Sequence, residues 1–306
     1  MNISVVSPVY GAPELLEELA SRLTTILKEL DKNYEIIFVN DGCPKGSWEI
    51  IQRLIESFPN IKGINLSRNF GQHRAISAGL ANAVGDYVIV MDCDLQDMPE
   101  EIPKLFSKTQ EGYDVVFGRR VSRKDSTWKK LCAKLYYSSF DYLTGFKTDS
   151  SIANFSIISR KVVDAYLQMP EQNRPYGYFI NWLGFKRCNI DIVHSDRPEG
   201  KSSYTLDKLI QIALNNIISE TNKPLKLGVK FGFLMSLISI VAALILIINW
   251  YVGNVVQGWT SIIVSIFFIA GLILAKLGLV GLYVGKVFDE TKKRPLYIIS
   301  DIIKSK

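Results

Sequence analysis

Two long apolar stretches near the C-terminus constrain the fold of this chain more than any other feature. Residues 231–251 contain no charged side chain, and residues 259–285 contain only Lys276. Helices of this length span about 30 Å of hydrocarbon, whereas buried helices of a soluble core are usually shorter. These stretches also explain a mean hydropathy of +0.13 and a hydrophobic share of 48%. The sequence therefore predicts a transmembrane helix hairpin.

The charges around this hairpin predict its orientation. Residues 252–258, which connect the two stretches, carry no charge. The positive-inside rule places the basic flanks, and with them the large N-terminal domain, in the cytoplasm. The same basic excess accounts for the net charge of +6 and the pI near 9.0, so no nucleic-acid partner is expected. We expect a multi-pass protein of the cell inner (cytoplasmic) membrane. The basic residues of the flanks are Lys223, Lys226, Lys230, Lys286, Lys292, Lys293 and Arg294.

The first part of the chain alternates apolar runs with amphipathic helical patterns. This alternation is typical of an α/β domain with a doubly wound, mostly parallel sheet. No GxGxxG motif follows the first run, which argues against the usual dinucleotide-binding fold. The runs predicted as strands are residues 3–9, 35–39, 61–66, 87–91 and 115–118, with a late strand at 187–194.

A cluster of oxygen-bearing side chains follows the apolar run at residues 88–91. Asp92, Asp94, Gln96 and Asp97 lie within six residues, where mutual repulsion is costly unless a cation or solvent compensates it. Ligands of α/β sheets bind beyond the carboxyl ends of strands. Oxygen ligands favour Mg²⁺ or Mn²⁺, and the cysteines and histidines show no zinc spacing. The alternative is a solvated acidic turn before a helix.

A group of cations follows the run at residues 115–118 in the same way. Arg119, Arg120, Arg123 and Lys124 stand within six residues. They could form a solvated face, but next to an acidic metal site phosphate binding is favoured, because arginine binds phosphate through two parallel donors.

The stretch DCDLQDMPE at residues 92–100 resembles the DxDLQDPPE stretch of glycosyltransferase family 2, in its polyprenyl-phosphate sugar transferase branch. The resemblance implies a GT-A fold and a metal-dependent hexosyltransferase. It implies Mg²⁺ or Mn²⁺ held by Asp92, Asp94 and Gln96, and catalytic roles for Asp94, Asp97 and Arg120.

Further motifs extend this resemblance along the chain. One is SRNFGQH at residues 67–73, which matches the family's RNFGQ stretch; His73 by itself is more typical of a helix surface than of a catalyst. These motifs imply that the donor nucleotide contacts the loops after the first three strands and a late basic loop, RPEGKSSY, which resembles the family's RxxGxSKY. This sequence departs from the family at Asn40, where an aspartate is usual, and at Ser151, Asn154 and Ser156, where acidic residues and an arginine are usual. The donor-binding residues implied are Pro8, Tyr10, Asp41, Arg68, Arg123, Arg197, Lys201 and Ser202, together with Asp92.

Near the C-terminus, residues 281–286 and 293–297 resemble a signature of bactoprenol glucosyltransferases. The resemblance implies an inverting transfer from a nucleotide sugar, with UDP favoured over GDP, to polyprenyl phosphate at the cytoplasmic membrane face. Such a phosphate needs no general base; for a hydroxyl acceptor, Asp97 or Asp149 could be the base. The rival functions are transfer to a saccharide or lipid hydroxyl, and a non-enzymatic membrane scaffold. Lys276 is expected to have a partner, either a lipid phosphate or a neighbouring subunit of a homo-oligomer; the alternative is that it snorkels.

The expected domain organisation has four parts. Residues 1–203 form the GT-A domain, and residues 204–230 form an amphipathic segment at the membrane surface. Residues 231–285 form the transmembrane hairpin, and residues 286–306 form a basic cytoplasmic tail.

Overall fold

The computed structural model of this chain describes residues 2–30, 33–120, 141–143, 152–193, 218, 221–252 and 258–305. The chain divides into two compact units. The sheet unit comprises Met1–Lys129, Thr148–Ser202 and Arg294–Lys306. The hairpin unit comprises Lys130–Lys147 and Ser203–Lys293. The chain therefore passes from the sheet unit to the hairpin unit twice and ends in the sheet unit.

The sheet unit is built on an eight-stranded mixed sheet with the order β7-β5-β6-β4-β1-β2-β3-β8. Strand β1 pairs in parallel with β2 and β4, β2 with β3, and β5 with β7. Strand β6 runs antiparallel to β4 and β5, and β8 runs antiparallel to β3. The strands are β1 Ile3–Val9, β2 Tyr34–Asn40, β3 Ile61–Leu66, β4 Tyr87–Val90, β5 Val115–Arg120, β6 Ile152–Ser159, β7 Arg187–Ile192 and β8 Ile299–Lys304.

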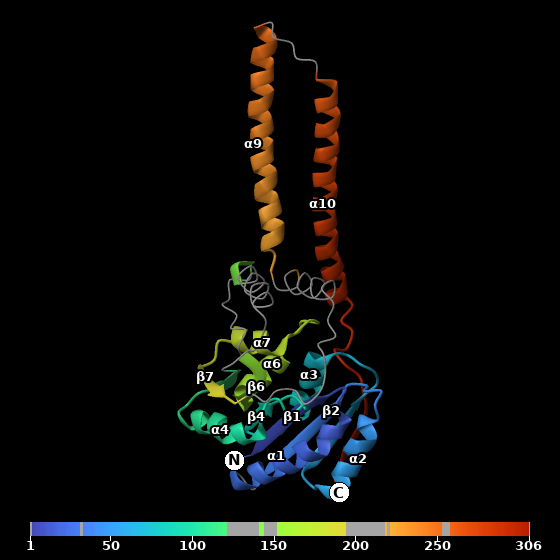
Figure 1. The fold of residues 1–306 in the computed structure, drawn as a ribbon, viewed down its shortest axis with the longest axis vertical. Helices are drawn as coiled ribbons and strands as arrows, with labels where there is room; N and C mark the ends of the chain where they lie inside the picture. The colour runs from blue at the N-terminus through green and yellow to red at the C-terminus, as the bar shows by residue number, and fades with distance from the viewer. Residues whose placement is uncertain are drawn as a thin grey trace. The chain divides into compact units, whose positions relative to one another are not determined.

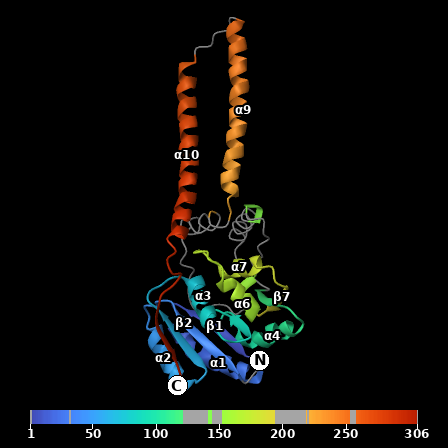
Figure 2. The ribbon, with the colours of Figure 1, turned by 180° about the vertical axis from the view of Figure 1, so that it is seen from behind.

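Helices cover both faces of this sheet, as Figures 1 and 2 show from opposite sides. Helices α1, α2 and α4 pack on one face, and α3, α6 and α7 pack on the other. The predicted α/β, GT-A-like architecture with a mostly parallel sheet is confirmed. The helices are α1 Leu16–Leu30, α2 Ser47–Ser57, α3 Gln72–Asn82, α4 Ile102–Gln110, α6 Arg160–Leu167 and α7 Tyr176–Trp182, with short 3-10 helices η1 Pro13–Leu15 and η2 Pro99–Glu101.

The central strands are apolar throughout because both of their faces are covered. Val5 and Ile89 lie in one core cluster, and their neighbours Val6 and Val90 lie in the other. All four side chains are fully buried. Burying a side chain of this size contributes about 1.5–3 kcal/mol, so an alternating polar pattern would be selected against here.

Two strands differ from the sequence expectation. Strand β6 is inserted between β4 and β5, and β8 occupies residues that we expected to belong to a basic tail. In β8 most side chains are exposed, but Ile303 packs against the core, and the adjoining Ile298 carbonyl accepts a hydrogen bond from the Ser67 N–H (2.9 Å). The residues from 294 onward are therefore part of the sheet unit.

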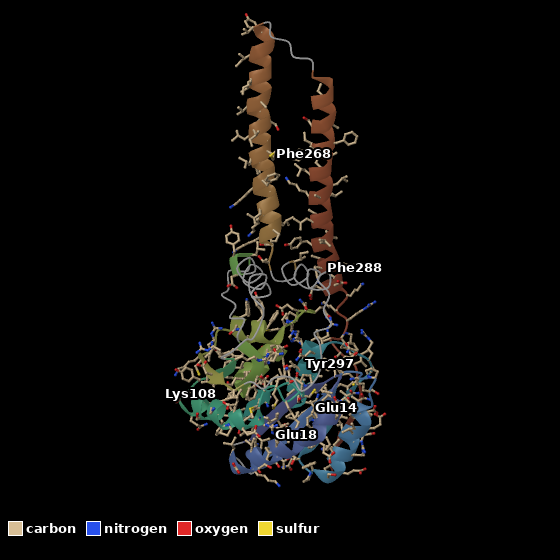
Figure 3. The ribbon with its side chains drawn as sticks, in the orientation of Figure 1. Glu14, Glu18, Lys108, Phe268, Phe288 and Tyr297 are labelled. Atoms are coloured by element: carbon tan, nitrogen blue, oxygen red, sulfur yellow. The ribbon has the colours of Figure 1, made fainter. Side chains whose placement is uncertain are left out.

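The hairpin unit contains two long helices, α9 Lys223–Tyr251 and α10 Trp259–Thr291, which lie side by side in both views (Figures 1 and 2). Apolar side chains project from them into the surroundings, for example Phe268 and Phe288 of α10, each about 60% exposed (Figure 3). Both helices are long and apolar enough to cross a membrane, and they contain the two stretches from which the hairpin was predicted.

Candidate functional site

The predicted site residues gather at one edge of the sheet. Strands β1 to β4 are parallel, so the loops that follow them emerge at the same edge. Val9 pairs with Asn40, so β1 and β2 end level, whereas β4 ends opposite Val6, three residues before the end of β1. Loops after adjacent parallel strands form the usual ligand-binding crevice of α/β proteins.

The acidic loop after β4 divides its side chains between two environments. From residue 92 to residue 99, partly exposed residues alternate with buried ones. Asp92, Asp94 and Gln96 are on the accessible side, whereas Asp97 is completely buried. Leu95 adopts a positive φ of 57°, which is unusual for leucine and marks the sharp bend of this loop. The three predicted metal ligands are therefore presented together, separately from Asp97.

Burial, together with the neighbouring carboxylates, raises the pKa of Asp92 to about 6. Burial is the largest cause, and the negative charges of Asp97 and Asp94 add to it. The Gln72 amide partly opposes this effect by donating a hydrogen bond to Asp92 Oδ1 (2.6 Å). The Asp94 carboxylate accepts a hydrogen bond from the Gln96 backbone N–H (3.2 Å).

A divalent cation fits this donor set. Crowded carboxylates whose ionisation is disfavoured are stabilised by a cation, and oxygen donors match the preference of Mg²⁺ and Mn²⁺. Among the residues that the structure describes, no three His, Cys, Asp or Glu side chains converge as a complete metal centre. The predicted set has two carboxylates and one amide, so a cation here would share its coordination with other oxygen atoms.

Arg120 and Asp97 form an ion pair beneath the acidic loop. Arg120, the last residue of β5, donates from Nη2 to both Asp97 oxygens at 3.3 Å. The Asp97 side chain is 0% exposed and that of Arg120 is 23% exposed. The Arg120 Nε atom is buried and has no hydrogen-bond partner among the described residues. Asp97 therefore holds the guanidinium in position, and the enclosure of its carboxylate does not suit proton abstraction from a substrate.

Asp41 connects the loops that follow β2 and β3. Its carboxylate accepts hydrogen bonds from the backbone N–H groups of Phe70 (2.7 Å) and Gly71 (2.9 Å). Burial raises the pKa of Asp41 even though these two bonds lower it. Asp41 thus organises the turn that leads into α3. Its contact with a nucleotide stays a prediction.

Gly42 allows these two loops to touch. Its φ is +61°, and a Cβ atom there would lie 2.5 Å from the Arg68 carbonyl carbon and from the Asn69 nitrogen. Only glycine permits this approach at this backbone conformation. Arg68 itself is exposed; its guanidinium lies 4.1 Å from the Phe70 ring centre and donates a hydrogen bond to the Asn69 carbonyl (3.0 Å).

The loop after β1 completes the described part of the site. Pro8 is buried within β1, and Tyr10 is 54% exposed. The Gly11 N–H donates to Cys43 Sγ (3.3 Å), which ties this loop to the one after β2. Burial alone would raise the pKa of the Cys43 thiol, but hydrogen bonding lowers it below its ordinary value.

Two residues of the motif at 67–73 have contacts that the sequence analysis did not assign. Gln72 binds Asp92, as described above, so the first turn of α3 contacts the acidic loop. His73, which we considered more typical of a helix surface, accepts a hydrogen bond from the Tyr176 N–H at Nδ1 (3.3 Å). Burial lowers the pKa of His73. The match of this segment to a family motif was the only signal for either contact.

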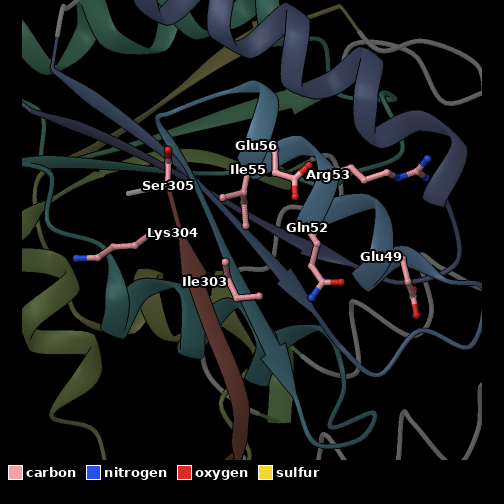
Figure 4. Close-up of a pocket in the computed structure, with 8 residues that line it drawn as sticks. All are labelled: Glu49, Gln52, Arg53, Ile55, Glu56, Ile303, Lys304 and Ser305. Atoms are coloured by element: carbon pink, nitrogen blue, oxygen red, sulfur yellow. The ribbon is translucent and has the colours of Figure 1, made fainter.

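Some predicted residues lie outside the described part of the chain. These are Arg123, Arg197, Lys201 and Ser202. A separate open pocket of about 620 Å³ lies between α2 and β8 (Figure 4), and none of the predicted site residues line it. Acidic, basic, polar and apolar side chains all line it. They are Glu49, Gln52, Arg53, Ile55, Glu56, Ile303, Lys304 and Ser305.

Comparison with known proteins identifies the family. Residues 4–167 match the model for glycosyl transferase family 2. The chain is 38% identical over 304 residues to an uncharacterized glycosyltransferase of Synechocystis sp., covering 99% of this chain and 96% of the relative. It is 33% identical to a prophage bactoprenol glucosyl transferase homolog of Escherichia coli, covering 99% and 100%. It is 34% identical to the undecaprenyl-phosphate 4-deoxy-4-formamido-L-arabinose transferase of Aeromonas hydrophila, covering 99% and 94%. The chain belongs to glycosyltransferase family 2.

Proposed function

We propose that this protein transfers a sugar from a UDP-sugar to polyprenyl phosphate at the cytoplasmic face of the membrane, with inversion at the anomeric carbon. The observation that carries the proposal is the presentation of Asp92 and Asp94 on the accessible side of the loop after β4, beside the loops after β1, β2 and β3. This is where an α/β sheet binds a diphosphate donor and its cation.

The names of the relatives support the class of acceptor. Two of them are named for transfer to bactoprenol or undecaprenyl phosphate, and both match over nearly their full length, including the two long helices. Those two relatives are named for different sugars, which supports a shared lipid acceptor and leaves the sugar to be found by assay.

The donor half of the reaction would depend on the acidic loop. Asp94, with Asp92 and Gln96, would hold Mg²⁺ or Mn²⁺ at the donor diphosphate. The bound ion would neutralise the charge that develops as UDP departs. Arg120, fixed from below by Asp97, would place a guanidinium near the same charge.

The acceptor half would depend on alignment more than on proton transfer. A lipid phosphate carries about −1.5 to −2 charges at pH 7, so its oxygen is already nucleophilic. The bond from the anomeric carbon to the UDP oxygen breaks, the bond to the acceptor oxygen forms, and UDP leaves with the electron pair. The positively charged residues must offset repulsion between the two phosphates.

The hairpin would keep the enzyme beside its lipid acceptor. The basic flanks of the two helices and the uncharged connection between them favour cytoplasmic placement of both flanks. A membrane-bound acceptor and a soluble donor would then meet at the cytoplasmic face.

The test uses full-length protein in nanodiscs that contain undecaprenyl phosphate. The protein is incubated with Mg²⁺ and a panel of UDP- and GDP-sugars, and the lipids are analysed by mass spectrometry. The expected product is undecaprenyl monophosphate carrying one sugar, formed from a UDP-sugar. Transfer to undecaprenol or to a saccharide hydroxyl, or no transfer from any donor, would overturn the proposal.

Asp94→Asn tests the role of the acidic loop in the same assay. Turnover should fall by a factor of about 10² to 10³ or more, because a group that helps to stabilise the departing charge is lost. Asp164→Asn on α6 is the matched control, since that carboxylate is exposed and distant in sequence from the site. Thermal melting should be unchanged in both variants. Full activity of Asp94→Asn, or of the parent protein in excess EDTA, would contradict the assignment.

A further inference from the structure

Three polar side chains form a row across strands β2, β3 and β8. Asn40, the last residue of β2, is paired with Asn65 of β3, and Asn65 is in turn paired with Asp301 of β8. Residues paired directly across neighbouring strands lie close enough for their side chains to interact. The row therefore connects the C-terminal strand to the point where the loop after β2 begins.

The hydrogen bonds along this row all point in the same direction. The Cys43 N–H donates to Asn40 Oδ1 (3.2 Å), and Asn40 Nδ2 donates to Asn65 Oδ1 (2.8 Å). Asn65 Nδ2 then donates to Asp301 Oδ2 (3.5 Å), and the Ser300 hydroxyl donates to the same oxygen (2.7 Å). The chain of bonds thus starts in the loop after β2 and ends on the carboxylate of β8.

The carboxylate of Asp301 sets this direction. An ionised carboxylate only accepts hydrogen bonds, so Asn65 turns its amide nitrogen toward Asp301 and its amide oxygen toward Asn40. Position 40 must then supply a donor, which an asparagine does and an ionised aspartate does not. The Asn40 side chain is buried, where a polar group without a partner is costly. The row therefore accounts for asparagine at a position where the family usually has aspartate.

The residues that Asn40 holds are in contact with the other loops of the site. Cys43 Sγ accepts the Gly11 N–H of the loop after β1 (3.3 Å). Asp41, next to Asn40, accepts two N–H groups of the loop after β3. A shift of the loop after β2 would consequently displace both of its neighbours.

We propose that Asp301 is a positioning residue that acts through Asn65 and Asn40 to hold the loop after β2 in the arrangement that binds the donor nucleotide. The identity of the donor rests on the proposed function. The C-terminal strand then supports the donor site through a side chain that does not itself touch the donor.

The test reverses the direction of the chain of hydrogen bonds. In Asn40→Asp, the Asn65 amide nitrogen can face only one of the two carboxylates, so the other contact becomes a repulsion between oxygen atoms. When Asp301→Asn is added, the new amide at position 301 donates to Asn65, and Asn65 donates to the new carboxylate at position 40. The Cys43 N–H retains its acceptor in both variants.

Calorimetry with UDP and Mg²⁺ on the full-length protein in detergent measures the effect without any lipid acceptor. Asn40→Asp should weaken UDP binding about tenfold, and adding Asp301→Asn should bring the affinity back to within about threefold of the parent. Asp301→Asn alone should weaken binding less than about threefold, because an amide oxygen still accepts from Asn65. As a control, adding Asp164→Asn, which removes an exposed carboxylate of α6, should not restore binding in Asn40→Asp. Failure of Asp301→Asn to restore it would overturn the proposal.

Transfer kinetics separate positioning from a merely structural role. Asn40→Asp should raise the KM for the donor about tenfold and change kcat less than about threefold, because the acidic loop after β4 is not part of the row. A loss of folded protein would instead lower kcat at an unchanged KM, and that result would contradict positioning.

Thermal unfolding without UDP separates this proposal from the proposed function. Asn40→Asp should melt about 2–4 °C below the parent, and adding Asp301→Asn should recover most of the difference. If the parent bound no UDP, the proposed function would be contradicted, whereas this recovery would still support the connection from β8 to the loop after β2. The absence of recovery would overturn the connection itself.

Discussion

Replacing Gly42 with alanine should destabilise the protein much more than the same change at Gly11. Both glycines have a positive φ, +61° and +87°, and both lie in loops that follow parallel strands. A Cβ atom at Gly11 would meet nothing within 4 Å, whereas one at Gly42 would lie 2.5 Å from the backbone of Arg68 and Asn69. The two variants therefore share the backbone strain and differ in the collision between loops.

The magnitude follows from this difference. The shared strain is about 1–2 kcal/mol, and the restricted unfolded chain returns about 0.4–1 kcal/mol, so Gly11→Ala should cost about 1 kcal/mol. At Gly42 the neighbouring loop must move, and it carries the N–H groups of Phe70 and Gly71 that Asp41 binds. Losing one hydrogen bond to a charged acceptor costs about 1.5–3 kcal/mol. Gly42→Ala should therefore cost about 3 kcal/mol in total.

Thermal unfolding of the two full-length variants in detergent, followed by near-UV circular dichroism, measures the difference. For a domain of this size, 1 kcal/mol corresponds to about 2–4 °C in Tm. Gly42→Ala should melt about 6–12 °C below the parent, and Gly11→Ala about 2–4 °C below it. The affinity for UDP, measured by calorimetry, should fall in Gly42→Ala because the loops at the site are displaced. Equal melting temperatures for the two variants would refute the reasoning.

Three further predictions concern the site and the hairpin. Arg120→Ala should lower kcat/KM by a factor of about 10² and destabilise the protein by about 2–3 kcal/mol. Adding Asp97→Asn to this variant should restore stability but not activity. Recovery of both stability and activity would contradict a functional role for the guanidinium. Between pH 7 and 9, iodoacetamide should modify Cys43 well before Cys93, because the pKa of Cys43 is lowered and burial raises that of Cys93 to about 12. UDP should protect Cys43 from modification. Faster labelling of Cys93 than of Cys43 would contradict the described burial. A cysteine at Asn254 should react with an impermeant reagent in intact cells, and labelling only after lysis would reverse the predicted topology.

The core of the fold could be predicted from the sequence because strands covered on both faces must be apolar throughout. The predicted runs at 3–9 and 61–66 coincide with β1 and β3, and the run at 87–91 differs from β4 by one residue. The site could be located for a related reason, since polar residues that follow such runs are brought together at the carboxyl edge of a parallel sheet.

The remaining features depend on contacts that no local pattern encodes. Strand β8 has two side chains packed against the core, Ile299 and Ile303, and its other residues are exposed, so it lacks the continuous apolar run from which the central strands were predicted. Strand β6 begins with residues of mixed polarity, and its place between β4 and β5 is set by antiparallel pairing across the sheet. The bond between Gln72 and Asp92 joins residues that are 20 positions apart, and only the folded loops bring them together.

The arrangement of carboxylates supports the proposed phosphate acceptor over a hydroxyl acceptor. Asp97 is enclosed and bound to Arg120, and the carboxylate of Asp41 is occupied by two backbone N–H groups. Asp92 and Asp94 remain accessible, but their crowding favours a cation. A hydroxyl acceptor requires a positioned base to remove its proton, whereas a phosphate requires alignment and compensation of its charge. Within the described residues, the site provides a held guanidinium and a place for a cation, and these are what a phosphate acceptor requires.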